Sequence, residues 1–256
     1  IDNSLNLKTR RRIQMKELET MTNNFERFIS EYNKLHEALK EKANKNRDFF
    51  SLLKRLEKDV IIARYKDELH LIRKLRNLLV HEKTTIHYDI AIPSEEVISQ
   101  MTYIRKQIIQ PATAGDHFSR KVFSFNIEDS LERLLYFINE KHLYQFPVFD
   151  EDGLAGVLSH NGITNWLAHD FSKNTIDFSR ITIEDIVADE ESYYHYEVIS
   201  SNTSLFDVEA MFSSNLFVGR SQYVILISDK NKIKKWEDLK GIITPWDLPE
   251  LMALLQ

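Results

Sequence analysis

An internal repeat in the C-terminal half of the chain is the feature that most constrains its fold. In each copy a predicted helix that opens with Ser-Leu, at Ser130 and Ser204, precedes two short apolar strands and a second helix. Glycines at Gly156 and Gly241 lie in the second strands, and the spacing between copies grows from 74 residues at the serines to 85 at the glycines. The second copy therefore has the longer hairpin. This pattern predicts two copies of one α/β fold. The predicted module covers residues 119–256, with repeats at about 119–170 and 194–256.

The N-terminal half shows helical periodicity and no strand pattern. Apolar residues recur at helical spacing from Phe25 to Ala43, around Phe49 to Leu56, and from about Ala63 to His81. Pro93 then begins a further predicted helix, which Pro111 ends. Residues 1–112 are therefore predicted to form an all-α bundle, and the fold class of the chain is an α domain followed by an α/β module.

The charges of the two halves have opposite signs. Residues 1–112 carry 22 Lys and Arg against 16 Asp and Glu, whereas residues 113–256 carry 12 against 23. The net charge of −5 for the whole chain hides this difference. A basic helical half and an acidic repeat half indicate two domains with different functions.

The composition excludes several kinds of site. The chain of 256 residues has no cysteine, which rules out disulfides, thiolate catalysis and Cys-ligated zinc. Its histidines and carboxylates show no spacing typical of a metal site, so no metal is expected. Because no apolar run approaches the roughly 18 residues needed to span a bilayer, and no signal peptide is visible, we expect a cytoplasmic protein without a membrane partner. The chain begins at Ile1 rather than at a methionine, and we therefore expect residues upstream to be missing.

A short motif in the basic half brings three groups that can act on a phosphodiester to the end of a predicted helix. Asn77 and His81 are four residues apart and so lie on one face, with Arg76 beside them. Arg76 can hold a phosphate while His81 exchanges a proton with a ribose hydroxyl or a leaving oxygen. A purely structural role is also compatible with the pattern, because the helix dipole stabilises a histidine at a helix C-terminus.

The four-helix pattern and the segment Leu75-Arg76-Asn77-Leu78-Leu79-Val80-His81 resemble the HEPN domain over about residues 20–112. The signature of that family, arginine, a polar residue, three variable positions and histidine, is matched by Arg76, Asn77 and His81. The resemblance implies a metal-independent endoribonuclease in which the 2′-hydroxyl of the RNA attacks and leaves a cyclic phosphate end. It also implies a homodimer whose cleft contains two copies of the motif. Other members of the family only bind, or pair with a nucleotidyltransferase, so non-catalytic roles stay open.

The repeat in the second half resembles the CBS domain, two copies of which pack into a Bateman module. The resemblance rests on the order of elements and on the closing segment Gly241-Ile242-Ile243-Thr244-Pro245-Trp246-Asp247-Leu248. It implies a regulatory site for an adenine nucleotide such as AMP, ADP or ATP. In that site the Thr244 hydroxyl meets ribose or phosphate oxygens, and the Asp247 carboxylate accepts hydrogen bonds from the ribose hydroxyls. A second interpretation of Asp247 is a helix-capping residue without a ligand.

The first copy departs from this pattern. It keeps a hydroxyl at Ser159, but Gly162 stands where the ribose-binding carboxylate belongs. The resemblance therefore implies one nucleotide per chain, held mainly by Thr244 and Asp247. Arg220 is the nearest phosphate partner suggested by the sequence of the second copy, and a surface role for this arginine is an equal alternative.

Together these features predict an adenine-nucleotide-regulated, metal-independent endoribonuclease that acts as a homodimer on RNA. The first alternative is a non-catalytic nucleotide sensor or adaptor whose helical domain dimerises or docks a partner. The second is a substrate domain that another enzyme modifies with a nucleotide, with Tyr88 and Tyr103 as candidate acceptors.

Overall fold

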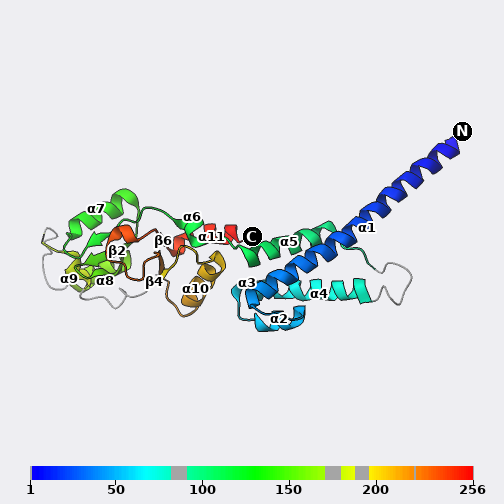
Figure 1. Cartoon of the computed structure of the whole chain (residues 1–256). Coiled ribbons are helices and arrows are strands. Elements are labelled where there is room, and N and C mark those ends of the chain that lie inside the picture. The colour runs from blue at the N-terminus through cyan, green and yellow to red at the C-terminus, as the bar shows by residue number, and fades with distance from the viewer. Residues whose placement is uncertain (1, 82–90, 171–179, 188–195, 222, 256) are drawn as a thin grey trace. The chain divides into compact units, whose positions relative to one another are not determined.

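Two structural units, Ile1–Pro111 and Ala112–Gln256, make up the chain in the computed structural model (Figure 1). The structure describes residues 2–81, 91–170, 180–187, 196–221 and 223–255, with side chains from Asn23 onward except those of His81 and Asp170. Each unit is considered by itself.

Helices make up the described part of the first unit. A long first helix packs along the last one, and three shorter helices connect them. The elements are α1 (Asp2–Ala43), α2 (Phe49–Arg55), α3 (Val60–Arg64), α4 (Lys66–His81) and α5 (Glu95–Ile109).

The apolar stripes of these helices meet in one core. Phe28 and Leu35 of α1, Leu69 of α4 and Met101 of α5 are fully buried. Burial of side chains of this size stabilises the fold by about 1.5–3 kcal/mol each. The helix starts are specified locally, as at α5, where the Ser94 hydroxyl accepts a hydrogen bond from the main-chain N–H of Val97.

The helix predicted from about Ala63 to His81 begins later than expected. Asp59 caps α3 by accepting hydrogen bonds from the N–H groups of Ile61 and Ile62, and α3 ends at Tyr65. The helix α4 then starts at Lys66 and continues to His81. Because Tyr65 is itself buried, the apolar stripe passes through the break, and periodicity alone does not reveal it.

The second unit contains two sheets with the same topology. In each sheet the first strand runs parallel to the second, and the second pairs with the third in an antiparallel hairpin. The first repeat consists of α6 (Ala114–Phe118), β1 (Phe125–Asn126), α7 (Leu131–Lys141), β2 (Gln145–Asp150), β3 (Gly153–Ser159) and α8 (His160–Asp170). The second consists of α9 (Ile183–Val187), β4 (Tyr196–Ile199), α10 (Leu205–Phe217), β5 (Val224–Ile227), β6 (Gly241–Ile243) and α11 (Leu248–Leu254), with short 3₁₀ helices η3 (Trp236–Asp238) and η4 (Pro245–Asp247).

The predicted starts of the repeated helices are confirmed. The hydroxyls of Ser130 and Ser204 cap α7 and α10 by accepting hydrogen bonds from Arg133 and Asp207 main-chain N–H groups. The two sheets share a core, in which Val157 of β3 and Leu226 of β5 belong to one buried cluster. The short elements α6, β1, α9 and β4 were not predicted from the sequence.

Each repeat begins with a short helix that attaches to the other repeat. In α6 the N–H groups of Ala114 and Gly115 donate to the carbonyls of Thr203 and Ser201 (2.8 Å each). In α9 the equivalent N–H groups of Ile183 and Glu184 donate to the carbonyls of Asp129 and Ile127 (2.9 Å each). This reciprocal pairing gives the unit an internal pseudo-twofold arrangement and joins segments between 54 and 89 residues apart in the sequence.

The chain then passes from α6 directly onto the second sheet. Ser119 forms an antiparallel bridge with Gly241, and the N–H of Arg120 donates to the carbonyl of Lys240 (2.9 Å). The approach is so close that a Cβ atom on Gly241 would lie 2.2 Å from the carbonyl oxygen of Phe118. A side chain at this position therefore has no room.

In the described part of the chain, no helix is both long enough and apolar enough to cross a membrane.

Replacement of Gly241 by alanine is expected to lower the free energy of unfolding of the second unit. The new methyl group would clash with the Phe118 backbone, and overpacking of this kind costs about 1–3 kcal/mol. Urea unfolding followed by circular dichroism measures the effect. An unchanged midpoint would show that α6 does not lie on β6 in solution.

Candidate functional site

A pocket of about 500 Å³ lies in the second unit where the segment after α6, the loop after α7 and the end of β6 meet. Its size falls within the range of about 300–1,000 Å³ typical of small-molecule sites. The residues that line it are Arg120, Lys121, Val122, Phe123, His142, Leu143, Tyr144, Gln145, Ile242, Thr244, Trp246 and Asp247. Thr244 and Asp247, which the sequence predicted as ligand-binding residues, both belong to it.

Asp247 is the polar centre of this pocket. It follows β6, where the chain turns into η4, and it is only 9% exposed. One oxygen, Oδ2, accepts hydrogen bonds from the main-chain N–H of Thr244 (2.7 Å) and from the Thr244 hydroxyl (2.9 Å). The carboxylate therefore has the capping function that the sequence left as an alternative, while also facing a pocket.

Arg120 neutralises the Asp247 carboxylate. Its Nη2 lies 2.9 Å from Oδ1 and 2.8 Å from Oδ2 of Asp247, and it also donates to the carbonyl of Ile242 (2.7 Å). The Arg120 side chain is 44% exposed, whereas that of Asp247 is 11% exposed. The arginine thus covers the carboxylate from the solvent side. A ligand that uses Asp247 must share it with Arg120 or displace the guanidinium.

Aromatic and cationic side chains form the rest of the lining. The rings of Tyr144 and Trp246 lie with their centroids 6.4 Å apart, and Trp246 is 75% exposed. Lys121 adds to the positive charge of Arg120, and His142 supplies an imidazole. Flat apolar rings beside cations suit a planar base that carries phosphate groups.

The sequence reasoning missed this aromatic and cationic part of the pocket. The only local signal was the adjacent pair Arg120-Lys121 in an acidic half of the chain. Its proximity to Asp247 depends on the pairing of Ser119 with Gly241, which joins segments 122 residues apart. No pattern in either segment alone reveals that pairing.

The other two predicted nucleotide-binding residues lie outside this pocket. The Ser159 hydroxyl is buried and accepts a hydrogen bond from the N–H of Gly162 (3.1 Å) at the start of α8. Arg220 is exposed and donates to the side-chain oxygen of Asn215 (3.2 Å).

Ser159 and Arg220 belong to the pseudo-twofold counterpart of the pocket. The sheet registers align Ser159 with Thr244 of the other repeat and Tyr223 with Tyr144. Burial raises the pKa of Tyr223, Glu197 adds to this increase, and the positive charge of Arg220 opposes it. Arg220 therefore lies near Tyr223, on the first-copy side, where Gly162 replaces the carboxylate.

The motif residues of the helical unit lie at the end of α4. Arg76 Nη1 lies 3.4 Å from the side-chain oxygen of Asn77, and the Arg76 guanidinium lies 5.6 Å from the ring centroid of Tyr32. His81 is the last residue of α4, and its side chain is outside the described part of the structure. The structure thus brings Arg76 and Asn77 together at the helix end where the sequence placed them.

The candidate acceptors of a nucleotide modification are only partly described. Tyr103 packs edge-on against Tyr65, with ring centroids 6.2 Å apart, while Tyr88 lies outside the described residues. Burial, together with a hydrogen bond to Tyr103, raises the pKa of Tyr65. Among the described residues, no group of three or more histidines and carboxylates is arranged to hold a metal ion.

Residues 114–169 match the family model of the CBS domain. Comparison with curated proteins gave no match. Among solved structures, the chain is similar to a CBS domain-containing protein of unknown function from Kribbella flavida, with 14% identity, 54% of this chain and 97% of that chain covered, and a TM-score of 0.40. It is also similar to a signal-transduction protein with CBS domains from Burkholderia ambifaria (17% identity, 54% and 87% covered, TM-score 0.40) and to CBSX2 in complex with AMP (19% identity, 56% and 97% covered, TM-score 0.39).

The family match covers the first repeat, and the second sheet repeats its strand order and pairing. The C-terminal unit therefore has the fold of a CBS-domain pair. The likeness of the helical unit to a HEPN domain stays a prediction.

Replacement of Asp247 by alanine is expected to cost more stability than replacement of Arg120 by glutamine. Loss of the carboxylate leaves two Thr244 donors without their acceptor, at a cost of about 1–3 kcal/mol. Because Arg120 is 44% exposed, solvent screening limits the loss of its charge to about 1 kcal/mol or less. Urea unfolding at neutral pH measures both variants, and equal losses would contradict the central role of Asp247.

Proposed function

We propose that the C-terminal unit binds an adenine nucleotide in the Asp247 pocket and thereby regulates the helical unit. The observation that carries the proposal is that Asp247 pairs with both Thr244 and Arg120 inside a pocket with aromatic walls. A ribose has two neighbouring hydroxyls, and a single carboxylate can accept a hydrogen bond from each of them. The same pocket supplies cations for the phosphates.

Binding requires an exchange of partners. The ribose hydroxyls donate to Asp247, and the guanidinium of Arg120 turns from the carboxylate to the phosphate, so each charged group keeps a partner of opposite charge or a strong donor. Lys121 and His142 lie close enough to the pocket to contact further phosphates. Tyr144 and Trp246 flank the base. AMP, ADP and ATP differ in how much of this cationic lining they use.

Nucleotide binding is expected to depend on Asp247. Isothermal titration of the full chain with AMP, ADP and ATP should show binding that Asp247→Ala weakens about tenfold or more, because hydrogen bonds to a charged group contribute about 1.5–3 kcal/mol. Asp152→Ala is the matched control, since Asp152 is an exposed carboxylate in the β2–β3 turn and does not line the pocket. Equal affinities for both variants, or no binding by the unmodified protein, would reject the proposal.

For the helical unit we propose metal-independent cleavage of RNA by Arg76, Asn77 and His81. The supporting observation is that Arg76 and Asn77 lie side by side at the end of α4, the same helix that ends with His81. In this mechanism Arg76 stabilises the developing charge on the phosphate, Asn77 orients the phosphate, and His81 transfers a proton. The proposed active form is a homodimer whose cleft contains the motif from both chains.

Regulation then requires that the nucleotide has different affinities for two arrangements of the dimer. Such coupling is reciprocal, so a bound, non-cleavable RNA should change the affinity for nucleotide. The alternative is a sensor or adaptor, in which the helical unit dimerises or docks a partner without cleaving RNA. The two proposals differ in whether His81 affects RNA turnover.

Cleavage of a mixed RNA pool in the presence of EDTA is expected to fall by about 100-fold or more in His81→Ala, as for loss of a general acid or base. His117→Ala is the control, because His117 is an exposed histidine of α6 far from the motif in sequence. The assay is repeated with ATP or AMP, which should change the rate of the unmodified protein. Equal, nucleotide-indifferent turnover in all proteins would favour the sensor or adaptor.

A further inference from the structure

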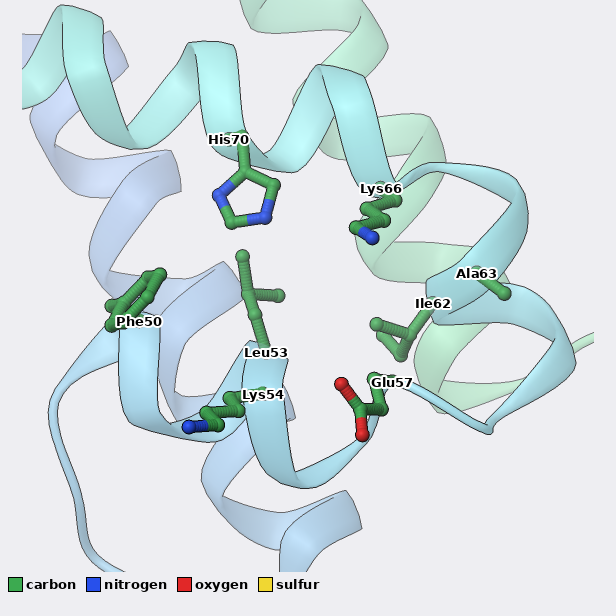
Figure 2. A pocket seen from close by; sticks show the side chains of 8 residues that line it. All are labelled: Phe50, Leu53, Lys54, Glu57, Ile62, Ala63, Lys66 and His70. Carbon is green, nitrogen blue, oxygen red and sulfur yellow. The ribbon is translucent and has the colours of Figure 1, made fainter.

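A small pocket lies between α2 and α4 of the helical unit (Figure 2). Its volume is about 180 Å³. Figure 2 shows Lys66 and His70 on α4 above the apolar side chains of Ile62 and Leu53. The remaining lining residues are Phe50, Lys54, Glu57 and Ala63. The lining thus combines two lysines and a histidine with one carboxylate.

Polar side chains continue from this pocket along α4. Lys66, His70, Arg73 and Asn77 recur at intervals of four, three and four, which places them on one face of the helix. From His70 onward the helix carries three cations and no carboxylate, a distribution that the dipole favours near a C-terminus. The face spans about 17 Å at about 1.5 Å per residue.

Aromatic rings lie next to these cations. The ring of Phe50 is 6.1 Å from that of His70, and the Arg73 guanidinium lies 5.1 Å from the Phe50 ring centroid. Phe50 is nevertheless 48% exposed, so part of its surface remains open. Further along α4, Arg76 has the same relation to Tyr32. Contacts between α4 side chains and aromatic rings therefore recur along α4 from His70 toward Asn77.

The positive charge of this face is not cancelled within the described residues. Five described cations of the unit do pair with carboxylates, namely Arg27, Lys34, Lys40, Lys42 and Arg105. No carboxylate in the described part of the chain pairs with Lys66 or Arg73. The Nε of Arg73 is also buried without a hydrogen-bond partner there. Cations that outnumber the one carboxylate of the pocket favour an anionic partner.

We propose that Phe50, Lys66, His70 and Arg73, which we name the α4 face, bind single-stranded RNA and guide it to the motif. Lys66 and Arg73 contact phosphates, and a base stacks on the exposed part of Phe50, a combination typical of single-strand binding. A length of about 17 Å accommodates about five stacked nucleotides at about 3.4 Å each. A small anion in the pocket alone would leave Arg73 unused. The inference rests on the proposal that the helical unit acts on RNA.

Binding is measured on the His81→Ala background, so that cleavage does not affect the result. Fluorescence anisotropy with a labelled 12-nucleotide RNA should show about three- to tenfold weaker binding for Lys66→Gln and for Arg73→Gln. Each substitution should also reduce the slope of log affinity against log salt by about 0.7. Phe50→Ala should weaken binding about tenfold with little change in that slope.

The control is Arg27→Gln, which removes the same charge from an arginine already paired with Glu95 (2.5 Å). It should bind RNA like the parent protein. Because Lys66 is exposed, its substitution leaves the fold intact and suffices for the test even if Arg73→Gln unfolds. Equal affinity and equal slope for Lys66→Gln, Phe50→Ala and Arg27→Gln would overturn the proposal.

Cleavage and binding can fail separately. If the unmodified protein cuts RNA but Lys66→Gln binds RNA normally, the α4 face is rejected and the ribonuclease proposal stands. If Lys66→Gln loses affinity as expected but no RNA is cut, the α4 face stands and the catalytic proposal is rejected.

Discussion

The main-chain hydrogen bonds by which α6 and α9 attach to opposite repeats determine where the Asp247 pocket forms. Gly115 donates to Ser201, and the chain then runs along β6 past Gly241. This path delivers Arg120 to Asp247. The carbonyl of Ser201 is held in turn by Asp229, which accepts hydrogen bonds from the Ser201 N–H and hydroxyl and pairs with Lys240. The hydrogen bonds from Lys240 and Ser201 hold the pKa of Asp229 well below its ordinary value.

The proposed binding of an anionic nucleotide by an acidic unit requires that cations at the pocket overcome the field of the unit locally. Asp247 would repel a phosphate if it stood alone. Instead its charge is matched by Arg120, and Lys121 adds a further cation at the rim. The net charge of the unit therefore says little about the ligand. The charge of the ligand that the pocket accepts depends instead on which cations the fold places within a few ångströms of the pocket.

Local signals made much of the fold predictable, and long-range pairing accounts for most of what was missed. Ser130 and Ser204 each cap a helix through a hydrogen bond to a residue three positions later, so the helix starts are predictable from local sequence. The apolar strands that follow are buried, as their pattern predicts. The strands β1 and β4 are short, and their pairing depends on partners elsewhere in the chain. The break at Tyr65 is hidden because the apolar stripe continues through it.

The residues of the candidate site also divide into those that local sequence predicts and those that long-range pairing brings in. Thr244 and Asp247 were recognisable because both lie in one short segment whose chemistry is local. Arg220 was chosen from its place in the second copy, but the fold puts it beside Tyr223, on the counterpart side. Arg120, which meets Asp247, is 127 residues away in sequence. The hydrogen bonds of α6 to the other repeat and the bridge between Ser119 and Gly241 bring the two residues together, and no pattern in the residues near Arg120 predicts that pairing.

The contact between Arg120 and Asp247 suggests how nucleotide binding affects the helical unit in the proposed regulation. Arg120 lies nine residues beyond Pro111, where the helical unit ends, and α6 occupies most of the segment between them. A nucleotide that takes over Asp247 releases Arg120 from its anchor at the C-terminal end of this segment. Because the hydrogen bonds of α6 to Thr203 and Ser201 remain, the release is confined to a few residues unless the ligand also favours a different seating of α6. Coupling therefore requires that the nucleotide distinguishes two positions of α6, and not merely that it binds near Arg120.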